Sequence, residues 1–248
     1  MEMFEVGGCV RDELLGVKSK DIDYSVVLND VEKMLCEQDD IPIFDFLELT
    51  LLGKGFDIFE LRPQYLTIRA KFPKGPSTIK SKRSGLTADF VLARKESDYT
   101  DGRRPDKVEP GTLMDDLARR DFTMNAIAKA ADGTLIDPFN GQWDIEHRII
   151  RAVGDPRERF TEDALRIVRA MRFAVTKDFK VEYQTEKAMR DLAPTVAGVS
   201  ADRVREELTK MFNVDPLLTI RVLEEYEMFP IIFNLGINFQ PTLKKKIR

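Results

Sequence analysis

The first half of the chain alternates short apolar runs with turns rich in glycine or charge, a pattern compatible with a mixed α/β domain. Met3 to Val6 is apolar, Gly7-Gly8 follows, and a helical pattern begins at Val10 and ends at Gly16. Asp21 to Leu28 is predicted as a strand. Further elements are expected as a helix at 31–37, an apolar run at 43–49, strands at 56–61 and 86–94, and a helix at 113–130.

The second half is mainly helical after a break at residues 137–141, where we place a domain boundary. Thr161 is predicted as a helix N-cap, with Glu162 and Asp163 in the first turn, where acidic side chains suit the helix dipole. The apolar side of this helix is expected to hold Leu165, Val168, Met171 and Ala174. Further helices are expected at 185–192, at 201–212 with Ser200 as cap, and at 216–226.

Length and composition narrow the class of protein. With 248 residues, 43% hydrophobic and 33% charged, the chain has room for one large or two modest domains. The net charge of -4 means that contacts with nucleic acid must come from local basic patches. Cys9 and Cys36 have no paired spacing, so we expect a reduced, cytoplasmic protein with no signal peptide and no membrane span. The single histidine, His147, argues against a Ser-His triad or a His-based zinc site.

The candidate chemistry gathers near the start of the chain. Asp21 and Asp23 project on the same face of the predicted strand, and their oxygens suit Mg²⁺ or Mn²⁺. Gly8 opens a helix N-terminus that can approach an anion, and Arg11 could hold a phosphate. Each motif alone also fits an ordinary turn or a solvated strand edge, but their order and closeness favour phosphoryl or nucleotidyl transfer. Asp89, on the strand at 86–94, is a candidate third carboxylate, to bind metal or accept a proton.

Basic residues dominate the segment from 62 to 83, in which no acidic residue occurs. Prolines and a glycine there predict an extended hairpin or loop. Both a solvated loop and a contact with RNA or triphosphate fit this pattern. The candidate RNA-binding residues are Arg62, Arg69, Lys71, Lys74, Lys80, Lys82 and Arg83.

Two helical patterns carry further charged candidates. Asp121 and Asn125, four residues apart, would share one face of the helix predicted at 113–130. A second set recurs every three residues, and its arginines require compensation by acids or by phosphates, two alternatives that stay open here. This second set comprises Asp163, Arg166, Arg169 and Arg172.

The ordered motifs resemble those of the class II tRNA nucleotidyltransferases (CCA-adding enzymes) and the related bacterial poly(A) polymerases, from about Phe4 to Phe212. Residues 7–12 with Asp21 and Asp23 resemble the catalytic motif of this family. The motifs that follow resemble, in order, a ribose-selecting motif at 119–126, a head–neck hinge at 137–145, a base-reading motif at 162–166 and a helix-capping motif at 201–207.

The resemblance implies roles for these residues. Asp21 and Asp23 would hold two Mg²⁺ ions, with Mn²⁺ as an alternative, and Gly8 and Arg11 would cradle the triphosphate. Asp121, held by Arg119 and Arg120, would accept a hydrogen bond from the ribose 2′-hydroxyl. The remaining nucleotide-binding residues would be Asn125, Glu162, Asp163, Arg166, Arg169 and Arg172, of which Asp163 and Arg166 would read the edge of cytosine or adenine.

The implied fold is an α/β nucleotidyltransferase head with a mixed sheet at 1–137, an all-helical neck at 138–212 and a short body at 213–248. The implied activity is template-independent addition of C and A, from CTP and ATP, to the 3′ end of tRNA. A loop at 99–105 resembles one associated with switching from C to A addition. A poly(A) polymerase, a partial CC- or A-adding enzyme and a non-catalytic RNA-binding protein on the same fold are the alternatives.

Overall fold

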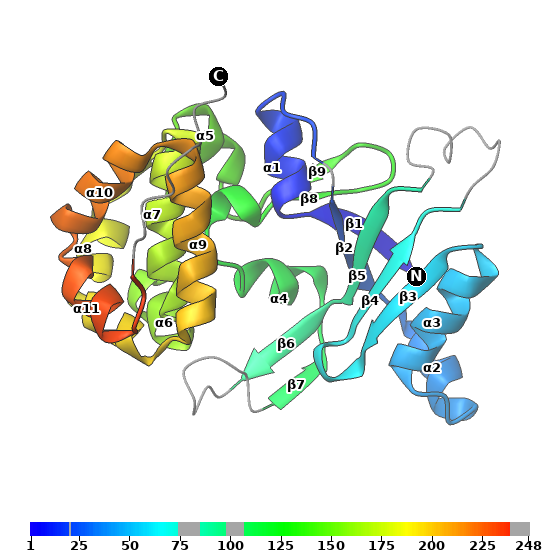
Figure 1. Cartoon of the computed structure of the whole chain (residues 1–248). Helices are drawn as coiled ribbons and strands as arrows, with labels where there is room; N and C mark the ends of the chain where they lie inside the picture. Colours follow the sequence, from blue (N-terminus) through cyan, green and yellow to red (C-terminus); the bar gives the residue numbers. More distant parts are fainter. Residues whose placement is uncertain (20, 74–84, 98–106, 239–248) are drawn as a thin grey trace, which may run out of the picture. The chain divides into compact units, whose positions relative to one another are not determined.

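The computed structural model describes residues 1–19, 21–73, 85–97 and 107–238, which form two compact units that divide after His147 (Figure 1). The sequence pattern placed the boundary at residue 137. Residues 138–147 stay with the first unit because helix α5, Gly141–Glu146, packs against helix α1, Gly8–Leu14, and the short 3₁₀ helix η2, Thr123–Asn125.

A mixed sheet organises the first unit, as the resemblance implied. Its strand order is β3-β4-β5-β2-β1-β8-β9, and among the described pairings within this sheet only the β2–β5 pair is parallel. Alternate residues of β5 are buried, which gives one face of the sheet to the core. The strands are β1 (Glu2–Val6), β2 (Ile22–Val27), β3 (Asp57–Arg62), β4 (Thr67–Lys71), β5 (Thr87–Leu92), β8 (Ala128–Lys129) and β9 (Leu135–Ile136).

The other elements of this unit follow local sequence signals. Capping boxes start α2 at Asn29 and α4 at Thr112, each with an acidic residue three positions later. The apolar run at 43–49 belongs to a helix, α3. The bounds are α2 (Asp30–Gln38), α3 (Ile43–Gly53), η1 (Pro63–Tyr65) and α4 (Leu113–Ala118), with a separate hairpin of β6 (Arg94–Ser97) and β7 (Lys107–Pro110).

The prediction of one helix from 113 to 130 is wrong, because helix α4 ends at Ala118. Phe122 is extended, and the Asp121 carboxylate accepts a hydrogen bond from its backbone N–H at 2.8 Å. A short polar side chain that bonds the local backbone in this way competes with helix formation. Asp121 and Asn125 therefore lie in a buried turn rather than on a surface helix.

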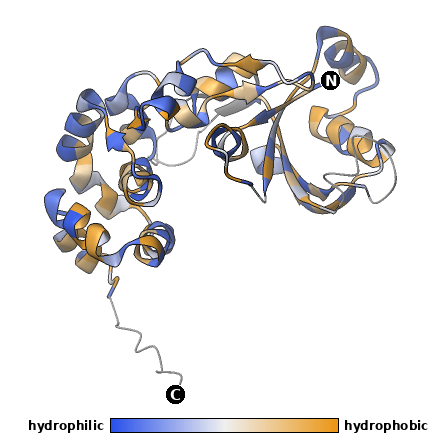
Figure 2. Cartoon of the chain, turned by 90° about the horizontal axis from the view of Figure 1, so that it is seen from above, coloured by the Kyte–Doolittle hydropathy of each residue, from blue (hydrophilic) through white to orange (hydrophobic). Residues whose placement is uncertain are grey.

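The second unit is helical, and its helices bury apolar sides against one another (Figure 2). Helix α7 packs against α9, and α6 packs against α8. A short parallel pair, β10 (Ile149–Ile150) and β11 (Lys180–Val181), lies beside α7. The helices are α6 (Pro156–Glu162), α7 (Leu165–Lys177), α8 (Tyr183–Leu192), η3 (Ala193–Gly198), α9 (Ala201–Val214), α10 (Pro216–Glu225) and α11 (Met228–Asn234).

One predicted helix start is wrong and another is confirmed. Thr161 lies inside α6, whose cap is Asp155, and Asp163 interrupts the helical path before α7. Helix α9 begins at Ala201 with Ser200 at its N-cap position, as predicted, although the Ser200 side chain makes no capping hydrogen bond within the described part of the chain. Across the residues that the structure describes, no helix has both the length and the apolar character needed to cross a membrane.

Candidate functional site

Asp23 and Asp89 lie on adjacent parallel strands, where the pairing of β2 with β5 places their Cα atoms opposite each other. Asp21 comes directly before β2. Burial raises the pKa of the Asp23 carboxyl above its ordinary value, and the nearby Asp89 and Asp21 carboxylates raise it further, while Arg120 lowers it. The fold thus gathers acidic groups whose mutual repulsion a cation would relieve.

Asp89 has a protein partner. Arg69 of β4 donates to its carboxylate at 2.6 Å from Nε, and the burial of Asp89 still raises its pKa. Among the described residues, no group of three or more His, Cys, Asp or Glu is arranged to hold a metal ion. The assignment of Asp89 to metal binding or proton transfer stays a prediction, as does the assignment of Asp21 and Asp23 to metal.

Gly7 joins β1 to α1 next to these carboxylates. Its φ is +76°, and a Cβ there would lie 2.9 Å from Arg120 Nη1 and 3.6 Å from Asp23 Oδ2. The backbone conformation therefore favours glycine, and an added Cβ would also displace the Arg120 guanidinium. The sequence pattern selected Gly8, but Gly7 is the constrained member of the pair.

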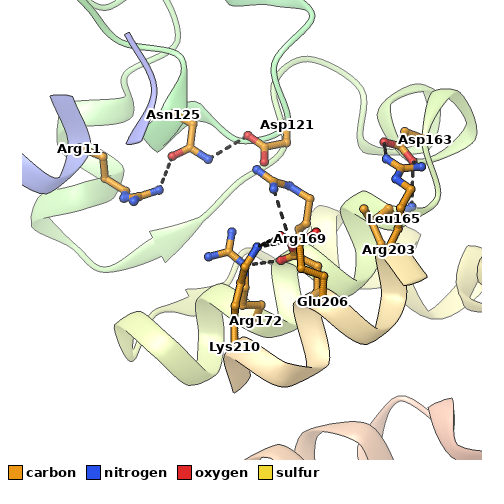
Figure 3. Close-up of polar contacts among 11 residues, drawn as sticks. Arg11, Asp121, Asn125, Asp163, Leu165, Arg169, Arg172, Arg203, Glu206 and Lys210 are labelled. Atoms are coloured by element: carbon orange, nitrogen blue, oxygen red, sulfur yellow. Dashed lines mark hydrogen bonds and ion pairs between the residues drawn. The ribbon is translucent and has the colours of Figure 1, made fainter. Parts of the chain in front are cut away.

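Three buried polar side chains form a chain of hydrogen bonds behind the glycine turn (Figure 3). Arg11 Nη1 donates to Asn125 Oδ1 at 2.7 Å, and Asn125 Nδ2 donates to Asp121 Oδ1 at 2.9 Å. Arg11 also donates to Asp12 at 2.8 Å. This chain fixes the orientation of the two residues that the resemblance implies for phosphate and ribose.

Asp116 is a site residue that the sequence reasoning missed. It is fully buried and accepts from Arg119 and from Arg120, the latter at 2.9 Å. Burial would raise the pKa of Asp116, but Arg120 and Arg119 outweigh this effect and lower the pKa to about 2. The sequence signal that could have identified Asp116 is its position three residues before Arg119 and four residues before Arg120, a spacing that brings side chains together on a helix.

The hinge-like motif builds a tight contact within the first unit. Asp137 accepts from the backbone N–H groups of Gly141 at 2.7 Å and Gln142 at 2.8 Å, which starts helix α5. Buried Asp144 then accepts from Thr123 Oγ1 at 2.6 Å. Helix α5 is thereby fastened to η2, the turn that carries Asn125.

The candidate base-reading residues lie where α6 meets α7 in the second unit. Glu162 accepts from Arg166 Nη1 at 2.7 Å and from Arg159 at 2.5 Å. Asp163 accepts from the backbone N–H of Leu165 at 3.1 Å and from Arg203 of α9. The side chains of Asp163 and Arg166 thus come from one short junction and have different ionic partners.

Arg169 and Arg172 of α7 face the buried carboxylate of Glu207 on α9. Arg172 Nε forms a close ion pair with it, and Arg169 Nη1 lies 3.9 Å from it. Arg172 also lies 3.8 Å from the centroid of the Phe173 ring. Acidic side chains of the protein therefore compensate the charge of these arginines, which is one of the two alternatives that the spacing allowed. This arrangement is also compatible with a phosphate contact.

The structure describes only part of the basic segment. Arg62 donates to Glu60 at 2.6 Å, Arg69 pairs with Asp89, and Lys71 Nζ lies 5.6 Å from the Phe59 ring centroid. Glu60 lies before residue 62, so the basic segment from 62 to 83 contains no acidic residue although Arg62 has an acidic partner. The other candidates, Lys74, Lys80, Lys82 and Arg83, and the loop at 99–105 lie outside the described residues.

The mixed sheet, its neighbouring carboxylates and the polar turn define a nucleotidyltransferase head. Residues 59–151 match the family described as the poly A polymerase head domain, and residues 178–239 match the one described as the probable RNA and SrmB-binding site of polymerase A. The chain belongs to the class II nucleotidyltransferase family that contains CCA-adding enzymes and bacterial poly(A) polymerases. Membership implies a general dependence on divalent metal.

Named relatives agree with this placement. A CCA-adding enzyme of Pediococcus pentosaceus is 53% identical over 157 residues, which are 60% of this chain and 39% of that protein. The CCA-adding enzyme of Bacillus stearothermophilus, solved in complex with CTP, matches with a TM-score of 0.72 at 29% identity, covering 93% of this chain and 49% of that one.

A third relative, the Thermotoga maritima CCA-adding enzyme complexed with tRNA, matches with a TM-score of 0.70 at 28% identity, covering 97% of this chain and 50% of that one. The chain thus spans about half the length of the relatives it matches, or less.

Proposed function

We propose that this protein adds C and A to the 3′ end of tRNA without a nucleic-acid template, using CTP and ATP and releasing pyrophosphate. The observation that carries the proposal is the pairing of Asp23 with Asp89 across β2 and β5, with Asp21 directly before β2. Acidic groups held together in this way are suited to a reaction on a polyphosphate that depends on a metal.

Asp21 and Asp23 are the residues that we assign to Mg²⁺. Their donor atoms are all carboxylate oxygens, which Mg²⁺ prefers and Mn²⁺ accepts. The raised pKa of Asp23 reflects burial and neighbouring negative charge, so the site fits a cation. When bound, such ions activate the attacking hydroxyl and stabilise the departing pyrophosphate.

The other residues of the head bind and orient the substrates. Asp89, whose pKa is raised by burial, is the candidate to take the proton of the RNA 3′-hydroxyl. The backbone at Gly8 and the guanidinium of Arg11 would contact the triphosphate. Asp121, whose Oδ1 accepts from Asn125 and from the backbone of Phe122, would meet the ribose 2′-hydroxyl.

The second unit supplies base selection. Asp163 offers acceptor oxygens to the amino group of cytosine or adenine, and Arg166 offers donors to the neighbouring ring nitrogen. Uracil and guanine present the opposite pattern at one or both positions. The relatives named above support this assignment, because one was solved with CTP and another with tRNA. The reduced, cytoplasmic setting expected from the cysteines remains a prediction, as does RNA binding by the basic segment.

The test is incorporation of labelled CTP and ATP into a tRNA transcript that lacks its CCA end, with Mg²⁺ and with a chelator. We expect activity that requires the metal, and a loss of at least about a thousandfold in Asp23→Asn and Asp21→Asn. Asp39→Asn, an exposed acid on another element, is the matched control and should behave as wild type. Equal activity in Asp23→Asn and wild type would contradict the proposal.

A further inference from the structure

Asp163 lies outside the regular helices of the second unit. It follows α6, precedes α7 and has an extended backbone, with φ of -150° and ψ of 101°. Its Oδ1 accepts at 3.1 Å from the backbone N–H of Leu165, the first residue of α7. This single bond leaves the carboxylate able to rotate about its own axis, so another contact must fix the direction of Oδ2.

Arg203 provides that contact from α9. Its Nη2 donates to Asp163 Oδ2 at 2.7 Å and its Nη1 to Oδ1 at 3.3 Å, a two-pronged arrangement that fixes the carboxylate plane (Figure 3). Both side chains are mostly shielded, with 26% of Arg203 and 18% of Asp163 exposed. The motif at 201–207, read from sequence as helix-capping, therefore places a guanidinium on the base-reading junction.

The neighbouring arginine is held apart from Asp163 by a separate acid. Arg166 Nη1 donates to Glu162 Oε2 at 2.7 Å, while the backbone N–H of Arg166 bonds the Asp163 carbonyl at 3.0 Å. Arg166 thus follows Asp163 by three residues, and its guanidinium has Glu162 as an ionic partner. If Arg166 paired with Asp163 instead, the acceptor and the donor needed to read a base would neutralise each other.

We propose that Arg203 is a positioning residue that determines nucleotide selectivity: it orients the Asp163 carboxylate and keeps it from pairing with Arg166. Arg203 acts through Asp163 and is given no contact with the nucleotide. The inference rests on the proposed function of Asp163 and Arg166 as base readers. It adds that the choice of C and A over U depends on a residue 40 positions away in sequence.

The experiment compares Arg203→Gln and Arg203→Lys with wild type by equilibrium binding of CTP, ATP and UTP and by incorporation of each nucleotide into tRNA. We expect the preference for CTP over UTP to fall about tenfold in Arg203→Gln. Arg203→Lys should be intermediate, because lysine keeps the charge and loses the fork. Arg205→Gln is the control, since the exposed Arg205 pairs with Asp202 on its own helix.

Thermal unfolding of each variant separates positioning from folding. A fall in the CTP to UTP ratio at an unchanged Tm supports the proposal. An unchanged ratio, or equal weakening of all three nucleotides together with a lower Tm, would overturn it. Failure of wild type to extend any tRNA would count against the proposed function, whereas the binding ratios would still decide the role of Arg203.

Discussion

Gly7 has a backbone conformation that a residue with a side chain rarely adopts. A side chain there would have to adopt φ of +76° with its Cβ 2.9 Å from Arg120 Nη1. We predict that Gly7→Ala lowers the free energy of unfolding by about 1–3 kcal/mol, because this backbone region is costly for any residue with a Cβ. Displacing Arg120 from Asp23 should reduce nucleotide incorporation as well.

Gly8→Ala is the matched control, because a Cβ at Gly8 would meet only Arg11 Nη2, at 3.5 Å, among the described residues. Urea unfolding measures both variants. Equal stability of Gly7→Ala and Gly8→Ala would show that the turn is not constrained as described.

Asp116 makes stability depend on pH. Its pKa in the folded protein is about 2, below the ordinary value of 3.8, so its pairing with Arg119 and Arg120 stabilises the fold fully above pH about 4. That contribution, about 2 kcal/mol by linkage, is lost as the pH falls from about 4 to about 2.

We therefore predict that Asp116→Asn is markedly less stable than wild type at pH 7, by about 3–5 kcal/mol, and that the difference shrinks below pH 4. Urea unfolding of both proteins at a series of pH values provides the measurement. A difference that stays constant down to pH 2 would contradict the assignment of the low pKa to Asp116.

Ionisation of Asp23 affects stability in the opposite direction to ionisation of Asp116. Its pKa is raised in the folded protein, first by burial and then by Asp89 and Asp21, so its ionised form weakens the fold at neutral pH. We predict that Asp23→Asn abolishes activity and, without metal, stabilises the protein by about 0.5–2 kcal/mol at pH 7. This gain should vanish below pH about 4, where the wild-type carboxyl is protonated in both states.

Adding Mg²⁺ should stabilise wild type and leave Asp23→Asn unchanged, because only wild type retains both carboxylates. Differential scanning fluorimetry with and without Mg²⁺ tests both statements. A variant that is less stable than wild type without metal would show that Asp23 has a structural role instead.

At the scale of elements, helix α5 and the turn η2 approach each other closely at Gly141. A Cβ at Gly141 would lie 2.1 Å from the Thr123 carbonyl oxygen, so helix and turn can meet only through glycine. We predict that Gly141→Ala costs about 3 kcal/mol of stability, at the upper end of overpacking effects, because the obstacle is backbone that cannot rotate away.

Gly53→Ala is the control, since no described atom lies within 4 Å of its Cβ position and its φ is ordinary. Thermal unfolding of the two variants gives the comparison, with ribonucleotide and deoxyribonucleotide incorporation as a second measurement. Preserved stability in Gly141→Ala would mean that α5 is not fastened to η2 as described.

The elements also show what the sequence could and could not predict. Alternation located the strands that carry Asp23 and Asp89, because the period of two is a local property. The helix predicted across Asp121 failed because the side chain of that residue accepts a hydrogen bond from the backbone N–H of Phe122, which no periodicity records. The Arg203–Asp163 and Arg69–Asp89 pairs join separate elements, so only the fold could reveal them.

At the scale of the whole molecule, each unit carries a different part of the proposed chemistry. The first holds the carboxylates and the turn of Asp121, and the second holds the Asp163–Arg166 junction with its partners on α9. The proposed catalytic residues and the proposed nucleotide-selecting residues therefore lie in different units. Changes at Asp23 should affect every nucleotide alike, whereas changes at Arg203 should alter which nucleotide is used.

The most direct measurement of the central claim is primer extension resolved to single nucleotides. Wild-type protein and Mg²⁺ are mixed with tRNA transcripts that end before CCA, after C and after CC, each with CTP, ATP or both. We predict addition that completes CCA on every transcript and then stops. A run of A on any RNA would contradict tRNA-specific CCA addition and identify a poly(A) polymerase, arrest after CC would identify a partial enzyme, and RNA binding without incorporation would identify a non-catalytic protein.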